Sequence, residues 1–214
     1  MDASANADRP ATVRSGIAGR LWDGARSEFS LRGYHGARVQ GIARRAGCNV
    51  ALLYRHWSSK KALYLDVLRA AWQSIGRVLD GVFAGGGGPS TVVQAYLDAH
   101  LSDPVRAQIL VREILDGGPF LSQLLTREPG LLEPIRRASV ALAPDSGHPA
   151  PPAEALRPGL DATLSVLCIG GLAALVASAH EAARPFFTGE PPSLDDWRRN
   201  LQDLLLHGVA GPAA

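Results

Sequence analysis

Cysteine is scarce in this 214-residue chain, which contains only Cys48 and Cys168. Two cysteines so far apart do not make the disulfide framework of a small secreted domain, and a reducing cytoplasm is the compartment we expect. The first ten residues are polar and lack the apolar stretch of a secretory signal. We expect residues 1–13 to form a disordered arm. A redox role for Cys48 stays open beside a purely structural one.

Motifs that would indicate an enzyme or a metalloprotein are missing as well. Gly85–Gly88 is rich in glycine, but no Gly-Lys-Ser/Thr follows it, so it predicts a flexible turn rather than a phosphate loop. His180-Glu181 lacks the second histidine of a zinc-binding helix. No nucleophile stands beside a candidate base. We therefore predict no enzymatic activity, no cofactor and no metal site.

Strand-like alternation of apolar and polar residues is absent, and helical spacings dominate. The predicted fold class is therefore all-α, in one or two domains. Beyond residue 61, helices are expected over 62–83, from Ser90, from Asp103, over 120–127, over 131–142, over 162–179 and from Ser193. Residues 143–159 are rich in Pro, Gly, Ala and Asp and predict a loop.

Charge is distributed unevenly along the chain, although the net charge is only +2. Residues 1–70 carry 12 Lys and Arg against 5 Asp and Glu, whereas residues 71–214 carry 10 against 15. A basic N-terminal part attached to an acidic remainder is typical of a protein that binds nucleic acid. Affinity that depends on salt is the expected consequence.

Two short helical patterns joined by a turn lie in this basic part. Val39, Ile42, Ala43 and Ala46 recur every three or four residues and predict one apolar helix face. Gly47 can end that helix with a positive φ, and the side chain of Asn49 can accept a backbone N–H at the start of the next. In the second helix Leu53 and Trp57 are predicted to be buried. The pattern is that of a helix-turn-helix.

The outer face of the second helix and the residues after it predict contact with DNA. Asn49, Ala51, Leu52, Arg55 and His56 are left for the surface, and the small Ala51 allows a close approach to a groove. Lys60 and Lys61, the only lysines in the chain, stand at a helix N-terminus, where positive charge opposes the helix dipole. We interpret this arrangement as a site for a DNA phosphate. An ordinary helical hairpin with a solvated basic face is the alternative.

The segment resembles the N-terminal domain of tetracycline-repressor-type (TetR) transcriptional regulators over about residues 14–70. The residues that carry the resemblance are Leu21 to Ala25, Phe29, Gly33-Tyr34, Val39, Ile42-Ala43, Ala46-Gly47, Leu53-Tyr54, Trp57, Ser59-Lys60 and Ala62-Leu63. The spacing from Phe29 to Leu63 holds without a gap. The resemblance implies a helix-turn-helix DNA-binding domain over 14–61 and a helical effector-binding and dimerisation domain over 62–214.

The resemblance also implies a set of DNA-binding residues. They are Arg38, Gln40, Asn49, Val50, Ala51, Leu52, Tyr54, Arg55, His56 and Lys60. Val50 and Leu52 are apolar where such proteins often carry polar residues, and contacts with thymine methyl groups are the expected alternative. Gly24 departs from a good helix former and is expected to cost up to about 1 kcal/mol relative to alanine.

Residues 162–179 contain no charged side chain. A membrane span is possible by length, but small and polar residues dilute the segment, and we predict instead a helix buried on most sides, with no membrane association. Gly170, Ala174 and Ser178 form a strip on which another helix can pack closely. The resemblance implies that the last two helices form a homodimer interface as a four-helix bundle. Its predicted residues are Leu164, Leu167, Gly170, Gly171, Ala174, Ser178, Trp197, Leu201, Leu204 and Leu205.

A small-molecule effector is implied by the same resemblance, and its pocket should be mostly apolar with a few polar groups. The candidates from the middle helices are Trp72, Tyr96, His100, Arg112, Glu113 and Phe120. The predicted function is that of a dimeric, sequence-specific repressor, which an effector releases from a palindromic DNA operator. The alternatives are a DNA-binding adaptor without an effector and an enzyme with an added basic domain.

Overall fold

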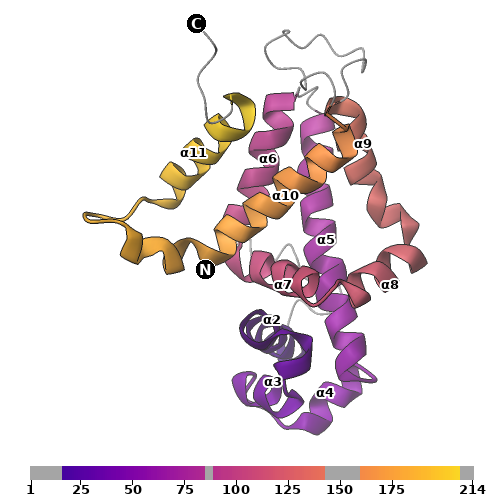
Figure 1. Ribbon diagram of the computed structural model, residues 1–214. Coiled ribbons are helices and arrows are strands. Elements are labelled where there is room, and N and C mark those ends of the chain that lie inside the picture. Colours follow the sequence, from indigo (N-terminus) through magenta and orange to yellow (C-terminus); the bar gives the residue numbers. More distant parts are fainter. Residues whose placement is uncertain (1–15, 85–88, 143–159, 208–214) are drawn as a thin grey trace, which may run out of the picture. The chain divides into compact units, whose positions relative to one another are not determined.

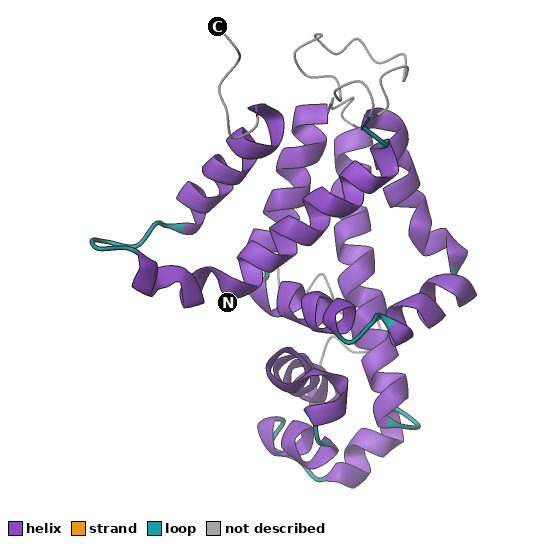
Figure 2. Cartoon of the chain, in the orientation of Figure 1, coloured by secondary structure: helices purple, strands orange, loops and turns teal. Residues whose placement is uncertain are grey.

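A computed structural model describes residues 16–84, 89–142 and 160–207, and every regular element in these ranges is helical (Figures 1 and 2). The elements are α2 (Gly16–Gly36), α3 (Val39–Arg45), α4 (Val50–His56), α5 (Lys60–Ala84), α6 (Pro89–Leu101), α7 (Pro104–Leu115), α8 (Pro119–Arg127), η2 (Pro129–Leu132), α9 (Glu133–Leu142), α10 (Ala162–Ala179), η4 (His180–Phe186) and α11 (Leu194–His207). The all-α prediction is confirmed. The predicted arm over 1–13 and the glycine run and loop over 85–88 and 143–159 lie outside the described residues.

The chain forms two compact units, which we call the head unit and the body unit. The head unit comprises the chain up to Ser74 together with Gln108–Pro129, and the body unit comprises Ile75–Ala107 together with the chain from Gly130. Helices α5 and α7 each contribute to both units. The unit that contains α2, α3 and α4 therefore extends beyond the 14–61 domain expected from the sequence.

The core of the head unit is built from α2, α3, α4 and the first half of α5. Trp22 and Phe29 of α2, Ile42 of α3 and Leu53 of α4 are at most 1% exposed. Gly24 lies where α2 crosses α3, and a Cβ atom at this position would come within 2.9 Å of the carbonyl oxygen of Ile42. Glycine is therefore required by the close approach of the two helices, which helix propensity alone does not reveal.

Replacement of Gly24 by alanine is accordingly expected to destabilise the protein by about 1–3 kcal/mol, because the new methyl group forces the backbones of α2 and α3 apart. Gly81 of α5 is the matched control, since it is exposed and has open space around its Cα. There alanine should stabilise by about 0.5–1 kcal/mol through helix propensity. Urea unfolding measures both changes, and stabilisation by Gly24→Ala would contradict the packing described for α2 and α3.

In the body unit α10 packs on α6 and α9, and α11 packs on α6 (Figure 1). Gly170 of α10 lies against Tyr96 of α6, since a Cβ atom at Gly170 would be 2.3 Å from Cε1 of the Tyr96 ring. Asp161 caps α10 by accepting a hydrogen bond from the Leu164 amide at 2.8 Å. Ser193 and Asp196 cap α11 reciprocally, as the sequence predicts.

In the single chain α10 is buried along one face only, whereas the sequence predicts burial on most sides. Val166, Ala173 and Ala177 face α6 and α9, whereas Leu164, Leu167 and Leu175 are 48–62% exposed. The segment 162–186 is long and apolar enough to cross a membrane, and 28% of its most apolar stretch is buried inside the protein. A single helix of this kind is weak evidence of a membrane span.

Candidate nucleic-acid interface

The turn between α3 and α4 has the geometry that the sequence predicts. Gly47 adopts a φ of 64°, and the amide of Cys48 donates to the carbonyl oxygen of Ala43 at 3.0 Å, which closes the end of α3. The Asn49 side chain accepts a hydrogen bond from the amide of Leu52 at 3.0 Å and so caps α4. These contacts fix the direction in which α4 leaves the turn.

Helix α4 presents one buried and one exposed side. Leu53 is fully buried and Trp57 is 5% exposed, as predicted, whereas Tyr54 is 49% exposed. Of the ten residues predicted to bind DNA, the exposed ones are Arg38, Gln40, Asn49, Ala51, Tyr54, Arg55 and His56, and the half-buried ones are Val50, Leu52 and Lys60. The structure therefore leaves the outer side of α4 and the start of α3 accessible to a ligand.

Some of the arginines in the head unit are engaged internally. The buried carboxylate of Glu28 accepts from Nε of Arg32 and from Nε of Arg45, each at 3.1 Å. Nε of Arg20 donates to the carbonyl oxygen of Ala46 at 3.0 Å. The two ion pairs explain how the charge of Glu28 is accommodated in a buried position on α2. The Glu28–Arg32 ion pair could have been predicted from the sequence, because residues four positions apart lie on the same face of a helix.

Other arginines on the α3–α4 surface have no such partner. Within the described part of the chain, Arg38, Arg44 and Arg55 are exposed and form no ion pair or side-chain hydrogen bond. Arg44 was not among the residues predicted to bind DNA, although it lies on the same short helix as Gln40. These three guanidinium groups are the positive charges that this surface offers to an anion.

Lys60 has an intramolecular role that the sequence did not reveal. Its Nζ donates to the carbonyl oxygens of Tyr34 and Ala37 at 2.8 and 3.0 Å and lies 4.4 Å from the centroid of the Tyr34 ring. Partial burial lowers the pKa of this lysine. The cation thus satisfies carbonyl groups at the C-terminal end of α2. These contacts explain why a lysine stands at the start of α5 even without a bound phosphate. The phosphate site predicted from the sequence is therefore not needed to explain the position of Lys60.

The end of α4 is anchored to α5. The indole Nε1 of Trp57 donates to Oδ2 of Asp66 at 2.9 Å, and Ser59 caps α5 by accepting from the amide of Ala62 at 3.0 Å. Asp66 is also paired with Arg69, whose guanidinium binds Glu128 and holds the pKa of that carboxyl below its usual value. The position of α4 in the head unit is therefore fixed at both of its ends.

Four effector candidates lie in the head unit. Glu113 is 1% exposed, and its carboxylate accepts from the Tyr64 hydroxyl at 2.9 Å and from the amides of Phe120 and Leu121 at 2.7 and 2.8 Å. Nε of Arg112 donates to the carbonyl oxygen of Ser30 at 2.6 Å. The Phe120 ring lies 4.3 Å from the Tyr34 ring. Trp72 is half-buried.

The other two candidates, Tyr96 and His100, lie in the body unit. Their rings are stacked with centroids 5.4 Å apart, and Nδ1 of His100 lies 2.9 Å from the carbonyl oxygen of Tyr96, which makes Nδ1 the protonated nitrogen. Burial, together with the nearby positive charge of Arg106, lowers the pKa of His100 to about 4. The six candidates therefore divide between the two units.

The low pKa of His100 makes a testable contribution to stability. Its folded pKa of about 4 lies below the ordinary value of 6.5, so the contribution is complete above pH 6.5 and is lost as the pH falls toward 4. The loss should amount to about 3 kcal/mol. Urea unfolding measures the free energy of unfolding at pH 7 and at pH 4.5. Between these pH values it should fall by about 2 kcal/mol less in His100→Phe than in the native protein. The exposed His56→Phe is the control, and equal losses in all three proteins would contradict the assignment.

The predicted dimer residues divide into three groups by their exposure in the single chain. Gly170, Ala174 and Leu201 are buried in their own protomer, and Gly170 of the small-residue strip packs on Tyr96 of α6. Leu164, Leu167, Gly171 and Leu204 are exposed, and Ser178, Trp197 and Leu205 are half-buried. Leu175, which is 51% exposed, continues the exposed apolar face of α10 but was not predicted.

Comparison with known proteins supports the interpretation of the head unit as a helix-turn-helix domain. Residues 21–67 match the family model described as "Bacterial regulatory proteins, tetR family". The chain is 30% identical over 126 residues to the HTH-type transcriptional regulator RutR of Escherichia coli (strain K12), which is 58% of this chain and 59% of RutR. It is 49% identical over 51 residues to the HTH-type transcriptional activator FasR of Mycolicibacterium smegmatis, which is 24% of this chain and 23% of FasR.

The fold extends further than the sequence likeness. The crystal structure of a TetR-family transcriptional regulator from Bordetella parapertussis 12822 matches with a TM-score of 0.65, covering 91% of this chain and 96% of that one at 21% identity. At this level of identity the match establishes the fold alone. The match with RutR spans less than two thirds of that relative's length.

Proposed function

We propose that this chain is a sequence-specific DNA-binding transcriptional regulator, because its helix-turn-helix domain belongs to the tetR family of bacterial regulatory proteins. The observation that carries the proposal is the α3–α4 surface. A capped helix there exposes Tyr54, Arg55 and His56, and Arg38 and Arg44 lie without ion-pair partners among the described residues. A helix of this kind fits the major groove of B-DNA, which admits a single α-helix.

Individual residues are assigned to two kinds of contact. Arg38, Arg44 and Arg55 supply charge-assisted contacts with phosphates, which position the protein without reading sequence. Gln40 reaches base edges, and Val50 and Leu52 contact thymine methyl groups. Asn49 keeps its amide nitrogen for a base, because its oxygen already caps α4.

The functional unit we propose is a cytoplasmic homodimer that recognises a palindromic operator. Two heads related by a two-fold axis contact half-sites about 34–36 Å apart, or a multiple of that distance. The exposed apolar face of α10 supports this pairing. We further propose that the protein is a repressor and that a small molecule releases it by binding the two conformations with different affinity. Helices α5 and α7, which both units share, connect the body unit to the head unit.

Arginine variants test the proposed DNA surface. Arg55→Ala and Arg38→Ala should each weaken binding to every duplex and reduce the slope of log affinity against log salt by about 1. Gln40→Ala should instead reduce the preference for the operator over other sequences. The control is Arg136→Ala on α9, because that arginine is 64% exposed and lies outside the α3–α4 surface. Fluorescence anisotropy at several salt concentrations measures all four, and equal effects of Arg136→Ala and Arg55→Ala would refute the assignment.

A further inference from the structure

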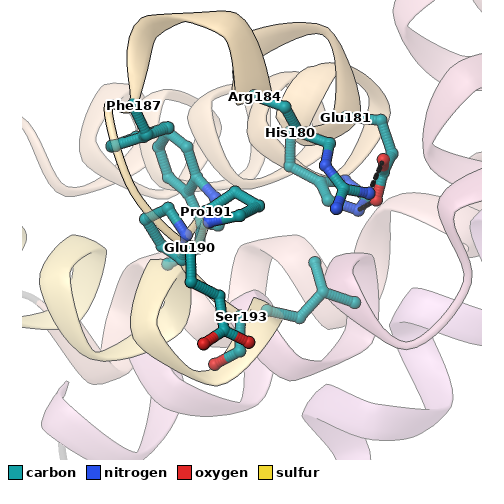
Figure 3. Close-up of a pocket in the computed structure, with 10 residues that line it drawn as sticks. His180, Glu181, Arg184, Phe187, Glu190, Pro191 and Ser193 are labelled. Carbon is teal, nitrogen blue, oxygen red and sulfur yellow. Dashed lines mark hydrogen bonds and ion pairs between the residues drawn. The ribbon is translucent and has the colours of Figure 1, made fainter.

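A pocket of about 320 Å³ lies in the body unit, on the segment that joins α10 to α11. Its walls come from η4, from the residues that follow it up to Ser193, and from the first turn of α11 (Figure 3). The volume lies within the range of small-molecule pockets. None of the six effector candidates discussed above lines it, so it is a separate site.

One side of the pocket is aromatic. The rings of Phe187 and Trp197 stand almost perpendicular, with an interplanar angle of 86° and centroids 6.2 Å apart. Pro191 lies beside Phe187 on the same side of the pocket (Figure 3). The faces of aromatic rings carry negative electrostatic potential and attract cations, most strongly in the case of tryptophan.

The other side of the pocket carries charges that are largely paired. Arg184 donates from Nη1 to Oε2 of Glu181 at 2.9 Å, and Nε2 of His180 lies 3.3 Å from the other oxygen of that carboxylate. The carboxylate of Glu190, an exposed residue of the pocket lining, lies beside Ser193 (Figure 3) and forms no ion pair or hydrogen bond with any described residue. The pocket therefore offers one carboxylate without a partner, while its only arginine is already neutralised.

We propose that this pocket binds a small organic cation with an apolar or aromatic body, such as a substituted ammonium ion. The cationic group lies near the Glu190 carboxylate, and the apolar body packs against Phe187 and Trp197. An anion of the same size is disfavoured, because it would face Glu190 and would have to separate Arg184 from Glu181. The proposal does not depend on DNA binding by the head unit.

Titration of the full-length protein with benzyltrimethylammonium chloride tests this site by isothermal titration calorimetry, with phenylacetate as the anionic probe. We expect saturable binding of the cation and none of the anion. Glu190→Gln should weaken the cation's affinity about fivefold through the lost charge attraction, and Phe187→Leu about threefold through the lost ring. Glu133→Gln, an acidic residue outside the pocket, and Phe186→Leu, the exposed neighbouring ring, should bind as the native protein does.

Three results would overturn the proposal. They are the absence of cation binding up to about 10 mM, equal binding of phenylacetate, and equal weakening by Glu133→Gln and Glu190→Gln, which would indicate a general effect of surface charge. Thermal unfolding of each variant shows whether its fold is intact. Glu190 and Phe187 are exposed, so their variants should unfold at the native temperature.

Discussion

Replacement of Glu113 by alanine is expected to lower the free energy of unfolding by about 3–5 kcal/mol, the largest loss we predict for a single residue. The carboxylate accepts three hydrogen bonds in a fully buried position, from the Tyr64 hydroxyl and from the first amides of α8. The carboxylate also replaces a conventional cap, because Gly118 at the N-terminus of α8 has no side chain to offer. Alanine would leave all three donors without an acceptor.

Two further variants separate this role from a general loss of negative charge. Glu113→Gln retains an oxygen for the amides of α8 and should lose only about 1 kcal/mol. Glu133→Ala removes an exposed carboxylate and should be nearly neutral. Urea unfolding curves measure the series, and a Glu113→Ala protein as stable as Glu133→Ala would contradict the capping role.

Replacement of both Leu164 and Leu167 by glutamate is expected to convert the protein to a monomer and to weaken operator binding by at least about 100-fold. Both leucines are exposed on α10 in the single chain, and in the proposed dimer they are buried against a second copy. Four charges would then face one another across the two-fold axis. The loss in DNA affinity follows because a monomer forfeits the effective concentration of the second head.

The matched control is Leu115→Glu, since Leu115 is 79% exposed and lies in the head unit on α7. It should leave the native molecular mass unchanged. Light scattering after size-exclusion chromatography gives the mass, and anisotropy gives the DNA affinity. A dimer that survives the double substitution would place the interface elsewhere.

Local signals in the sequence were sufficient to predict the helix-turn-helix. Gly47 and Asn49 act within a few residues of their own position, and the spacing of Leu53 and Trp57 reports burial on one helix face. The bounds of α10 were predicted for the same reason, because Asp161 caps it and charged residues end the apolar run. Such features depend on neighbours along the chain and can be read without a structure.

Contacts between distant residues could not be predicted in this way. Gly24 looked costly for a helix, and only its approach to Ile42 shows why glycine is needed there. Lys60 looked like a phosphate ligand, and only the fold brings its ammonium group to the carbonyl oxygens of Tyr34 and Ala37. Gly170 looked like part of a dimer interface until α6 was seen to pack on it.

The effector candidates show the same limit on a larger scale. Their residue types are those expected for the polar groups of an apolar pocket, but the sequence does not reveal which helices lie close together. Glu113 and Arg112 bind partners within the head unit, whereas Tyr96 and His100 stack in the body unit. The pocket at the start of α11 was missed, because its aromatic side combines a loop residue with a helix residue ten positions later.

Selection of bound duplexes from a random DNA pool tests the central claim most directly, namely that α4 of two paired heads reads DNA sequence. The native protein should enrich a palindrome with half-site centres about 34–36 Å apart or a multiple of this spacing, bound by two protomers. The Arg38→Ala, Arg55→Ala double variant should recover far less DNA from the same pool. Enrichment of no sequence by the native protein, or of a site without two-fold symmetry, would contradict the account.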